Sequence, residues 1–217
     1  MEESLVNSVL KQIKSIFPSA VLAGIVIGLG GLVFLSLDSK VLGSLFFTVG
    51  LFTICTRQLH LFTGKVCYVF ENPPAYAAML PVIWLGNFTG TWLLAKAVSF
   101  TRLASLSQKA AILCETKQQD SLLSLFLLGV FCNILIFIAV DGYKENPHTV
   151  GKYLALFFGV TVFILAGTEH CVADMFYFGI AGQLGDGDTL ARLLVITAGN
   201  ICGGVLLPLI KKWTAAQ

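Results

Sequence analysis

The chain has 217 residues, of which 56% are hydrophobic and 12% are charged, and its formal net charge is +2. Soluble domains carry about a quarter charged residues, so this composition excludes an ordinary soluble domain and indicates an integral membrane protein. The small net charge and the lack of a nucleic-acid-binding motif give no reason to expect a nucleic-acid partner.

The first residues predict an amphipathic helix rather than a signal peptide. Acidic residues stand at Glu2 and Glu3, where a signal peptide would carry positive charge. Apolar residues recur at about helical spacing, at Leu5, Val9, Ile13 and Ile16. A helix of this kind lies along a membrane surface, so we expect residues 1–17 to form an interfacial helix ahead of the first span.

Long uncharged runs predict six membrane-spanning helices, because a helix needs about 20 apolar residues to cross the hydrocarbon core. The segments of a transmembrane β-barrel are shorter and alternating. The predicted spans are Ser15–Leu37, Val41–Thr56, Asn72–Ala95, Ser121–Val140, Tyr153–Thr168 continuing through Met175–Gly185, and Leu193–Ile210. Six crossings place both termini on one side of the cell membrane, and a slight excess of lysine there favours the cytoplasm.

Two of these spans, the second and the fifth, are predicted to be broken. The apolar run of the second span meets Arg57–His60 and then continues as Leu61–Lys65, and the fifth span is interrupted at Gly167–His170. Irregular backbone at membrane depth must be buried in protein or line a watery cavity. Interrupted segments at corresponding positions are a sequence pointer to a substrate path.

A short internal repeat relates the two halves of the chain. Leu85–Leu94 reads LGNFTGTWLL and Ala198–Leu207 reads AGNICGGVLL, in spans three and six. An odd number of spans per half inverts the second half relative to the first, as in many transporters. We therefore predict one transmembrane channel domain over residues 1–217, with repeats at 18–100 and 121–217 and a connecting loop at 101–120.

Glu169 and His170 are the most informative polar residues, because an acid and an imidazole at membrane depth are costly and usually functional. His170 can donate a hydrogen bond or exchange a proton near neutral pH, although a buried histidine can also be satisfied by a neighbouring hydroxyl or carbonyl. Adjacent helical residues do not share a face, so Glu169 is expected to pair with a cation elsewhere. Lys117 is the candidate, unless it is an ordinary solvated loop lysine.

Two further residues lie at the break in the second span. Thr63 supplies a hydroxyl that would face His170 from the other half, or would repair a carbonyl freed by the break. Lys65 would attract anions, or pair with Glu71 or with a lipid phosphate. The six cysteines predict neither a disulfide framework nor a metal site, since most lie in apolar runs and no C-x-x-C spacing occurs.

Several motifs, in order along the chain, resemble those of the formate/nitrite transporter family. Gly167–Met175 (GTEHCVADM) is similar to its G-x-E-H-x-x-A-N-M signature, and Leu61–Thr63 to its L-F-T loop. Lys117 stands sixteen residues before Asn133, as the lysine and asparagine of the family do. Gly199–Gly204 is similar to its G-N-I-x-G-G segment.

The resemblance implies a pentamer of aquaporin-like protomers, each with its own pore for small monovalent anions such as formate, nitrite or hydrosulfide, without a cofactor. Thr63 and His170 would face a central chamber, where the substrate could exchange a proton. Lys117 and Glu169, near Asn133, would form a supporting charge network. One hydrophobic constriction would comprise Phe47, Leu51 and Leu61, and Phe163 would lie at the other, with Phe62 as a further constriction residue.

The chain departs from the family pattern at three positions. Asp174 stands where the family usually has asparagine, His60 replaces an acid common before the L-F-T loop, and Lys65 replaces a small or polar residue. With these departures the chain resembles the hydrosulfide-channel subgroup of the family. They argue against formate as the substrate.

Two other classes of function compete with an anion channel. An aquaporin-like facilitator of neutral solutes would carry two N-P-A motifs, which the sequence lacks. A membrane enzyme using Glu169 and His170 would need a second acid/base cluster or a metal motif, and neither is apparent. We therefore predict a transport protein rather than an enzyme.

Overall fold

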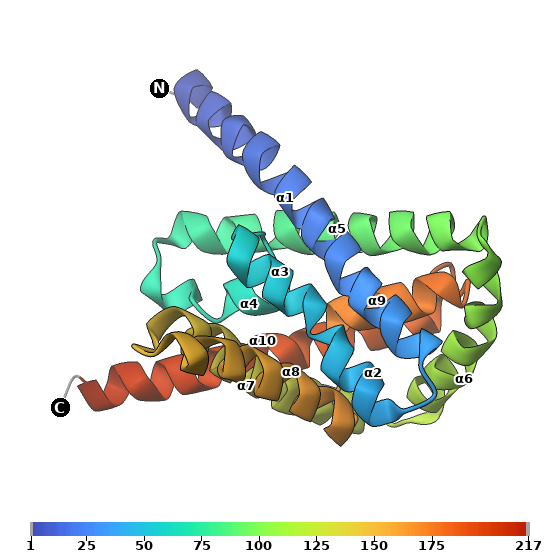
Figure 1. Cartoon of the computed structure of the whole chain (residues 1–217). Coiled ribbons are helices and arrows are strands. Elements are labelled where there is room, and N and C mark those ends of the chain that lie inside the picture. The colour runs from blue at the N-terminus through green and yellow to red at the C-terminus, as the bar shows by residue number, and fades with distance from the viewer. Residues whose placement is uncertain (1, 216–217) are drawn as a thin grey trace.

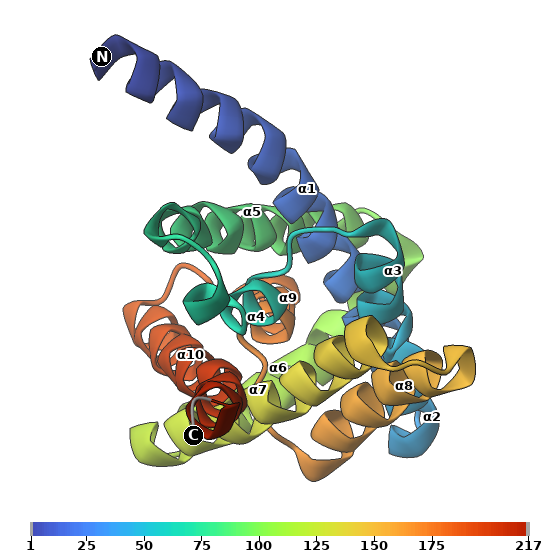
Figure 2. The ribbon, with the colours of Figure 1, turned by 90° about the vertical axis from the view of Figure 1, so that its left-hand side faces the viewer.

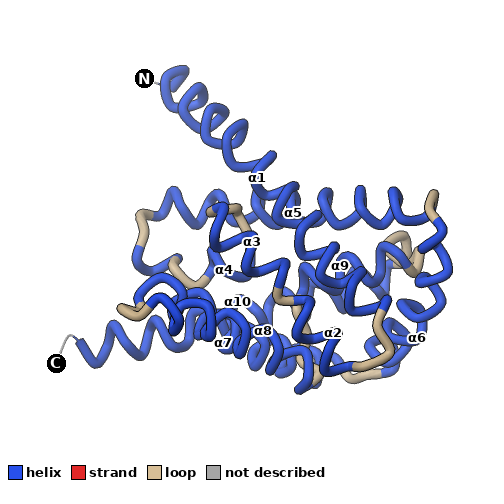
Figure 3. Tube along the Cα trace, in the orientation of Figure 1, coloured by secondary structure: helices blue, strands red, loops and turns tan. Residues whose placement is uncertain are grey.

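The computed structural model describes residues 2–215, and the regular structure in that range is helical (Figure 3). The elements in chain order are α1 (Glu2–Ser36), α2 (Lys40–Phe47), α3 (Val49–Arg57), α4 (Phe62–Val66), η1 (Val69–Glu71), α5 (Pro74–Ser99), η2 (Arg102–Ser105), α6 (Leu106–Gln119), α7 (Leu122–Glu145), α8 (Thr149–Ala166), α9 (Cys171–Ile180) and α10 (Gly187–Ala215).

Six stretches of the described chain are long and apolar enough to cross a membrane, which confirms the predicted fold class. They are Lys11–Ser36, Lys40–Arg57, Pro74–Ser99, Leu122–Glu145, Thr149–Ala166 and Gly187–Thr214. Each overlaps one of the six spans predicted from the uncharged runs, so the chain is a multi-pass membrane protein.

Helix α1 carries the N-terminal segment and the first span without a break. It passes through Pro18 and continues to Ser36, and its N-terminal part extends beyond the other helices (Figure 1). The predicted boundary between an interfacial helix at residues 1–17 and the first span is therefore not an interruption of the backbone. That this part lies along a membrane surface stays a prediction.

The two halves of the molecule repeat the same order of elements. A long helix, an interrupted segment and a second long helix form the first half (α1, α2–α4, α5), and α7, α8–α9 and α10 form the second. Within each half the two long helices pack together, α1 against α5 and α7 against α10. Because each half crosses three times, the second is inverted relative to the first.

Glycines of the repeated G-N-x-x-G segment allow this close helix packing. A Cβ atom at Gly90 would collide with the carbonyl oxygen of Val21, and one at Gly203 would collide with that of Val130. Any side chain at either position would push the two long helices apart. The repeat in the sequence thus marks equivalent contacts in the two halves.

The connecting segment, predicted as a loop over residues 101–120, is mostly helical and is corrected here. Helix α6 buries Ala110, Cys114 and Lys117 on one side and packs against α9. Their spacing is that of one helical face. Charged and amide side chains surround this face, so the segment contains no long apolar run that would have indicated a helix.

The two short helices α4 and α9 lie at the centre of the molecule. Figure 2 looks along the bundle and shows both helices surrounded by the longer ones. On the outside of the bundle, large apolar side chains are exposed, including Leu123, Phe158 and Leu194. An exposed apolar surface of this extent suits lipid rather than water.

Candidate functional site

Both interrupted segments have the same turn at the break, after α3 in the first half and after α8 in the second. The residues after α3 and α8, Gln58 and Gly167, adopt left-handed backbone with φ of 55° and 72°. In each segment the following amide, of Leu59 or Thr168, bonds back to the last turn of the helix, over 3.0 Å and 3.1 Å. This is the Schellman motif, which satisfies carbonyls that a helix end leaves unpaired. That these turns lie at membrane depth stays a prediction.

In the first half, Asn87 of α5 ties the interrupted segment to the long helices. Its Oδ1 accepts a hydrogen bond from the amide of Phe62 at 2.8 Å, at the start of α4. Its Nδ2 donates to the carbonyls of Ala20 and His60, at 2.7 Å and 2.9 Å. One buried side chain therefore satisfies three backbone groups around the break.

In the second half, Asn200 of α10 makes the equivalent set of bonds. Its Oδ1 accepts from the amide of Cys171 at 2.9 Å, and its Nδ2 donates to the carbonyls of Gly129 and Glu169, both at 2.8 Å. Glu169 is thus the counterpart of His60 in the inverted repeat. The sequence pattern alone gave neither asparagine a role, although both stand in the repeated G-N-x-x-G segment.

His170 and Thr63 meet between the two halves. Nδ1 of His170 accepts from the amide of Ala173 at 3.1 Å and caps α9, while Nε2 lies 2.9 Å from Oγ1 of Thr63. In the neutral ring an accepting Nδ1 carries no hydrogen, so Nε2 carries it and donates to the threonine hydroxyl. Both side chains are buried, and the structure brings together the pair expected to face each other from the two halves.

Lys117 is buried in an ion cluster and is not a solvated loop residue. Its Nζ contacts Oε2 of Glu169 and lies 3.0 Å from Oδ1 of Asp174. The side chains of all three residues are less than a tenth exposed. The expected pairing of Lys117 with Glu169 is therefore present, and Asp174 joins it as a second carboxylate.

Two cavities approach the Thr63–His170 pair. The larger, of about 590 Å³, is lined by Leu51, Leu61 and Lys65, among others. The smaller, of about 180 Å³, is lined by His170, Phe163 and the three residues of the ion cluster. The larger cavity thus holds two lysines and one acid, and the smaller holds two lysines, Lys40 and Lys117, and two acids.

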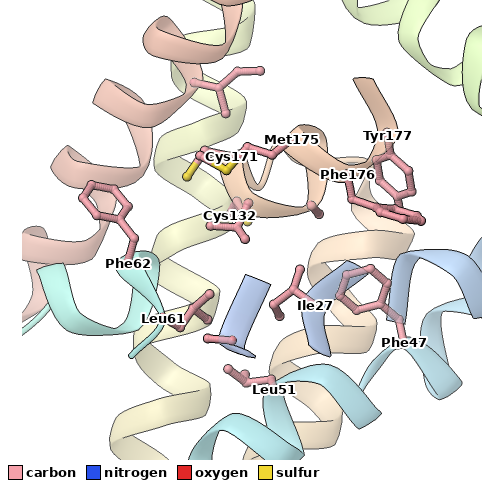
Figure 4. Packing of buried hydrophobic residues seen from close by; sticks show 14 of the residues in the cluster. Ile27, Phe47, Leu51, Leu61, Phe62, Cys132, Cys171, Met175, Phe176 and Tyr177 are labelled. Carbon is pink, nitrogen blue, oxygen red and sulfur yellow. The ribbon is translucent and has the colours of Figure 1, made fainter. Parts of the chain in front are cut away.

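Phe47 lies with Phe163 and not with Leu51 and Leu61, which corrects the predicted grouping. The rings of Phe47 and Phe163 are 6.1 Å apart and nearly perpendicular, and both line the smaller cavity. Figure 4 shows Leu51 near Leu61 and Phe47 apart from them. Phe47 ends α2 and Leu51 lies about one helical turn further along, in α3, so the two side chains contact different cavities.

Phe62 lines neither of these two cavities, and its place in a constriction stays a prediction. Its side chain is buried in the hydrophobic core and points away from Leu61 (Figure 4). Adjacent residues at the start of a helix diverge, so Phe62 cannot share the direction of Leu61. Phe163 does stack on the His170 ring, with centroids 5.6 Å apart.

Asn133 and Lys65 occupy different surroundings. Asn133 is buried and donates from Nδ2 to the carbonyls of Thr63 and Asn200, at 3.2 Å and 2.6 Å, so it supports the backbone behind Thr63. Lys65 is partly buried and shares the lining of the larger cavity with Glu71. The part of the chain that the structure describes contains no ion pair between these two residues.

Comparison with known proteins agrees with this architecture. The family model described as formate/nitrite transporter matches residues 1–214. The nitrite transporter NirC of Salmonella typhimurium is 28% identical over 221 residues, covering 91% of this chain and 81% of NirC. A pentameric formate channel superposes with a TM-score of 0.78 at 24% identity, covering 95% of this chain and 98% of that one. An ion channel of the FNT family gives 0.80 at 22% identity and covers 99% of both chains.

Proposed function

Because the chain belongs to the formate/nitrite transporter family, we propose that it carries small monovalent anions such as formate, nitrite or hydrosulfide across a membrane, through a pore in each protomer. Relatives named as a nitrite transporter in Salmonella typhimurium and a formate channel in Haemophilus influenzae support transport of an anion rather than catalysis.

The observation that carries the proposal is the contact between His170 and Thr63, with a cavity approaching from each side. Apolar residues flank this contact: Leu51 and Leu61 line the larger cavity, and Phe163 stacks on His170. Two polar groups between apolar walls are the arrangement that a small anion needs, since most of the path offers it no hydrogen bond.

The barrier to anion passage is desolvation, because an ionised group moved into an apolar region loses several kcal/mol or more of hydration. Where an anion replaces the direct contact between them, the Nε2–H of His170 and the hydroxyl of Thr63 can each donate one hydrogen bond to it. Lys65 in the larger cavity raises the local anion concentration. An anion that takes up a proton from cavity water, relayed through the His170 ring, crosses the apolar walls as a neutral acid and returns the proton to water on the far side.

The test replaces His170 with asparagine. The amide would keep a side-chain acceptor near the start of α9 but cannot exchange a proton near neutral pH. We expect His170→Asn to reduce formate and nitrite flux about tenfold or more and to flatten its dependence on pH, measured in proteoliposomes between about pH 5 and 8.

If His170→Asn carries as much anion as the wild type at every pH in that range, the proposed role of His170 is wrong. The panel should include formate, nitrite, hydrosulfide and acetate, with glycerol as a neutral solute. Wild-type protein that passes glycerol and none of the anions would instead identify a neutral-solute facilitator.

The proposal extends to assembly and location. We place the protein in the cell membrane as a homopentamer. Six spans return the chain to its starting side, and the slight excess of lysine on that side places both termini in the cytoplasm. Lipid would cover the exposed apolar side chains that face outward from the pentamer. Antibodies should reach epitope tags at the two ends only after the cell membrane is permeabilised. Binding of antibody to intact cells would show that the termini lie outside.

A further inference from the structure

The ion cluster contains two carboxylates and one ammonium group. Lys117 Nζ contacts Glu169 and Asp174 together. Within the described part of the chain, neither carboxylate lies at ion-pair distance from another lysine, arginine or histidine. If both acids are ionised, the buried cluster carries one excess negative charge.

One oxygen of this cluster has nothing to bond with. Oδ2 of Asp174 is buried and has no hydrogen-bond donor, and the whole residue is 2% exposed. Oε2 of Glu169 and Oδ1 of Asp174 contact the same ammonium nitrogen, so the two carboxylates are close neighbours around it. Two ionised carboxylates are acceptors only, so these groups oppose each other unless a proton lies between them.

We propose that Asp174 and Glu169 share a proton, and that this proton controls the entry of anions from the smaller cavity toward His170. The control of anion entry rests on the proposed function, and the shared proton does not. A proton taken from water converts one carboxylate to a carboxylic acid, which donates to the other carboxylate. Lys117 then balances the remaining negative charge.

The consequence for an anion follows from the sign of the charge. All three residues line the cavity that His170 also lines. With the proton bound the cluster is neutral, and an anion meets no excess negative charge. When the proton leaves as the pH rises, one negative charge remains in a small, poorly hydrated space, where repulsion is weakly screened. Entry therefore falls with rising pH.

Other charged groups around the cluster do not supply the missing positive charge. Arg192 of α10 donates to the carbonyl of Lys117 but forms its ion pair with Asp188. Lys40 of α2 lines the same cavity, but it is exposed to solvent, and its ammonium group donates to the carbonyl of Leu165 rather than to either carboxylate. Further titratable neighbours are uncharged in their ordinary form: Cys114 of α6, Cys132 of α7, and His170, Cys171 and Tyr177 of the α9 segment.

Asp174→Asn is the informative variant because asparagine has the same shape. Its oxygen can accept from Lys117 and its Nδ2 can donate to Glu169, so the cluster is satisfied without a proton. The variant should fold as the wild type does, which melting and size-exclusion profiles verify. Asp38→Asn is the matched control, since Asp38 also pairs with a lysine, 2.9 Å from Lys109, but is exposed.

The first measurement is infrared difference spectroscopy of purified protein during a pH titration, which does not depend on transport. We expect the carbonyl stretch of a protonated carboxylic acid at neutral pH in the wild type and in Asp38→Asn, and its loss in Asp174→Asn. Absence of this band in the wild type, or its persistence in Asp174→Asn, would overturn the shared proton.

The second measurement is formate flux in proteoliposomes, expressed as the ratio of Asp174→Asn to wild type so that the protonation of formate itself cancels. Once the pH exceeds the titration point of the cluster, this ratio should rise about tenfold per pH unit. A constant ratio in a wild type that shows the infrared band would disprove control of entry. A wild type that carries no anion would disprove the proposed function and leave the infrared result to decide the proton.

Discussion

At the scale of single residues, the cap of α9 decides what His170 can do. The amide of Ala173 donates to Nδ1 of His170, which leaves Nε2 as the nitrogen that carries the hydrogen and faces Thr63. A second proton on the ring would have to displace the Ala173 hydrogen bond. His170 therefore presents a donor to the centre of the molecule, and its direction is set by the backbone of its own helix.

Thr63 should matter through its hydroxyl alone. We expect Thr63→Val, which keeps the branched shape, to reduce anion flux about tenfold, because one donor to the anion is lost and the Nε2–H of His170 loses its partner. Thr63→Ser keeps the hydroxyl and should remain close to wild type in the same proteoliposome assay. Equal flux in the valine and serine variants would contradict this role.

Lys117 should matter for both stability and uptake. Removing one partner of a buried ion pair leaves uncompensated charge and costs about 3–5 kcal/mol, so Lys117→Ala should melt well below wild type in detergent. It should also take up less anion at low substrate concentration, because the remaining carboxylates repel it. Lys109→Ala, at an exposed pair with Asp38, serves as the control. Wild-type uptake by Lys117→Ala at low substrate would contradict the prediction.

At the scale of elements, each half ends a helix at a left-handed turn and then starts a short helix. The turn after the first helix is the same in both, but one half uses Gly167 and the other uses Gln58 in left-handed backbone. Asn87 and Asn200 then satisfy the backbone groups around each break. The breaks are therefore fixed structures and not flexible hinges.

At the two turns we expect substitutions to change the free energy of unfolding in opposite directions. Left-handed backbone costs a residue with a Cβ about 1 kcal/mol or more, so Gly167→Ala should lower the free energy of unfolding by that amount. A Cβ at Gly167 would touch nothing within 4 Å, so crowding is not the cause. Gln58→Gly should raise stability by less, because glycine also increases the entropy of the unfolded chain.

Unfolding in mixtures of mild detergent and denaturing detergent provides the measurement for both turns. Gly185 supplies the control for Gly167→Ala, because a Cβ there would also meet nothing and its backbone is not left-handed. Gly185→Ala should therefore leave the free energy of unfolding close to that of the wild type. Equal effects of alanine at the two glycines would show that backbone strain is not responsible.

At the scale of the whole molecule, the outer surface and the centre have opposite properties. The outer faces of the long helices expose large apolar side chains, while the ionisable residues of α9 and its surroundings are buried. A membrane protein of this kind needs partners for its outer surface, either lipid or further copies of the chain.

We expect the purified protein to be a pentamer. Native mass spectrometry from mild detergent should give a mass about five times that of the 23.4 kDa chain. A monomer or dimer that retains anion flux would contradict the pentamer. It would still be consistent with a separate pore in each protomer.

The sequence by itself determined the membrane class, the six spans and the inverted repeat. These depend on local composition: uncharged runs long enough to cross a bilayer, and one glycine–asparagine segment that recurs in both halves. It also indicated His170, Thr63, Lys117 and Glu169, because ionisable and polar groups in or beside apolar membrane segments are costly and usually serve a function.

Only the tertiary structure decided how these residues combine. It placed Phe47 beside Phe163, turned Phe62 away from the cavities and folded the connecting segment into α6. It also showed that Asp174 pairs with Lys117, the same lysine that pairs with Glu169. The physical reason is that direction and partnership depend on helix register and on contacts between segments far apart in the chain, which composition and spacing do not specify.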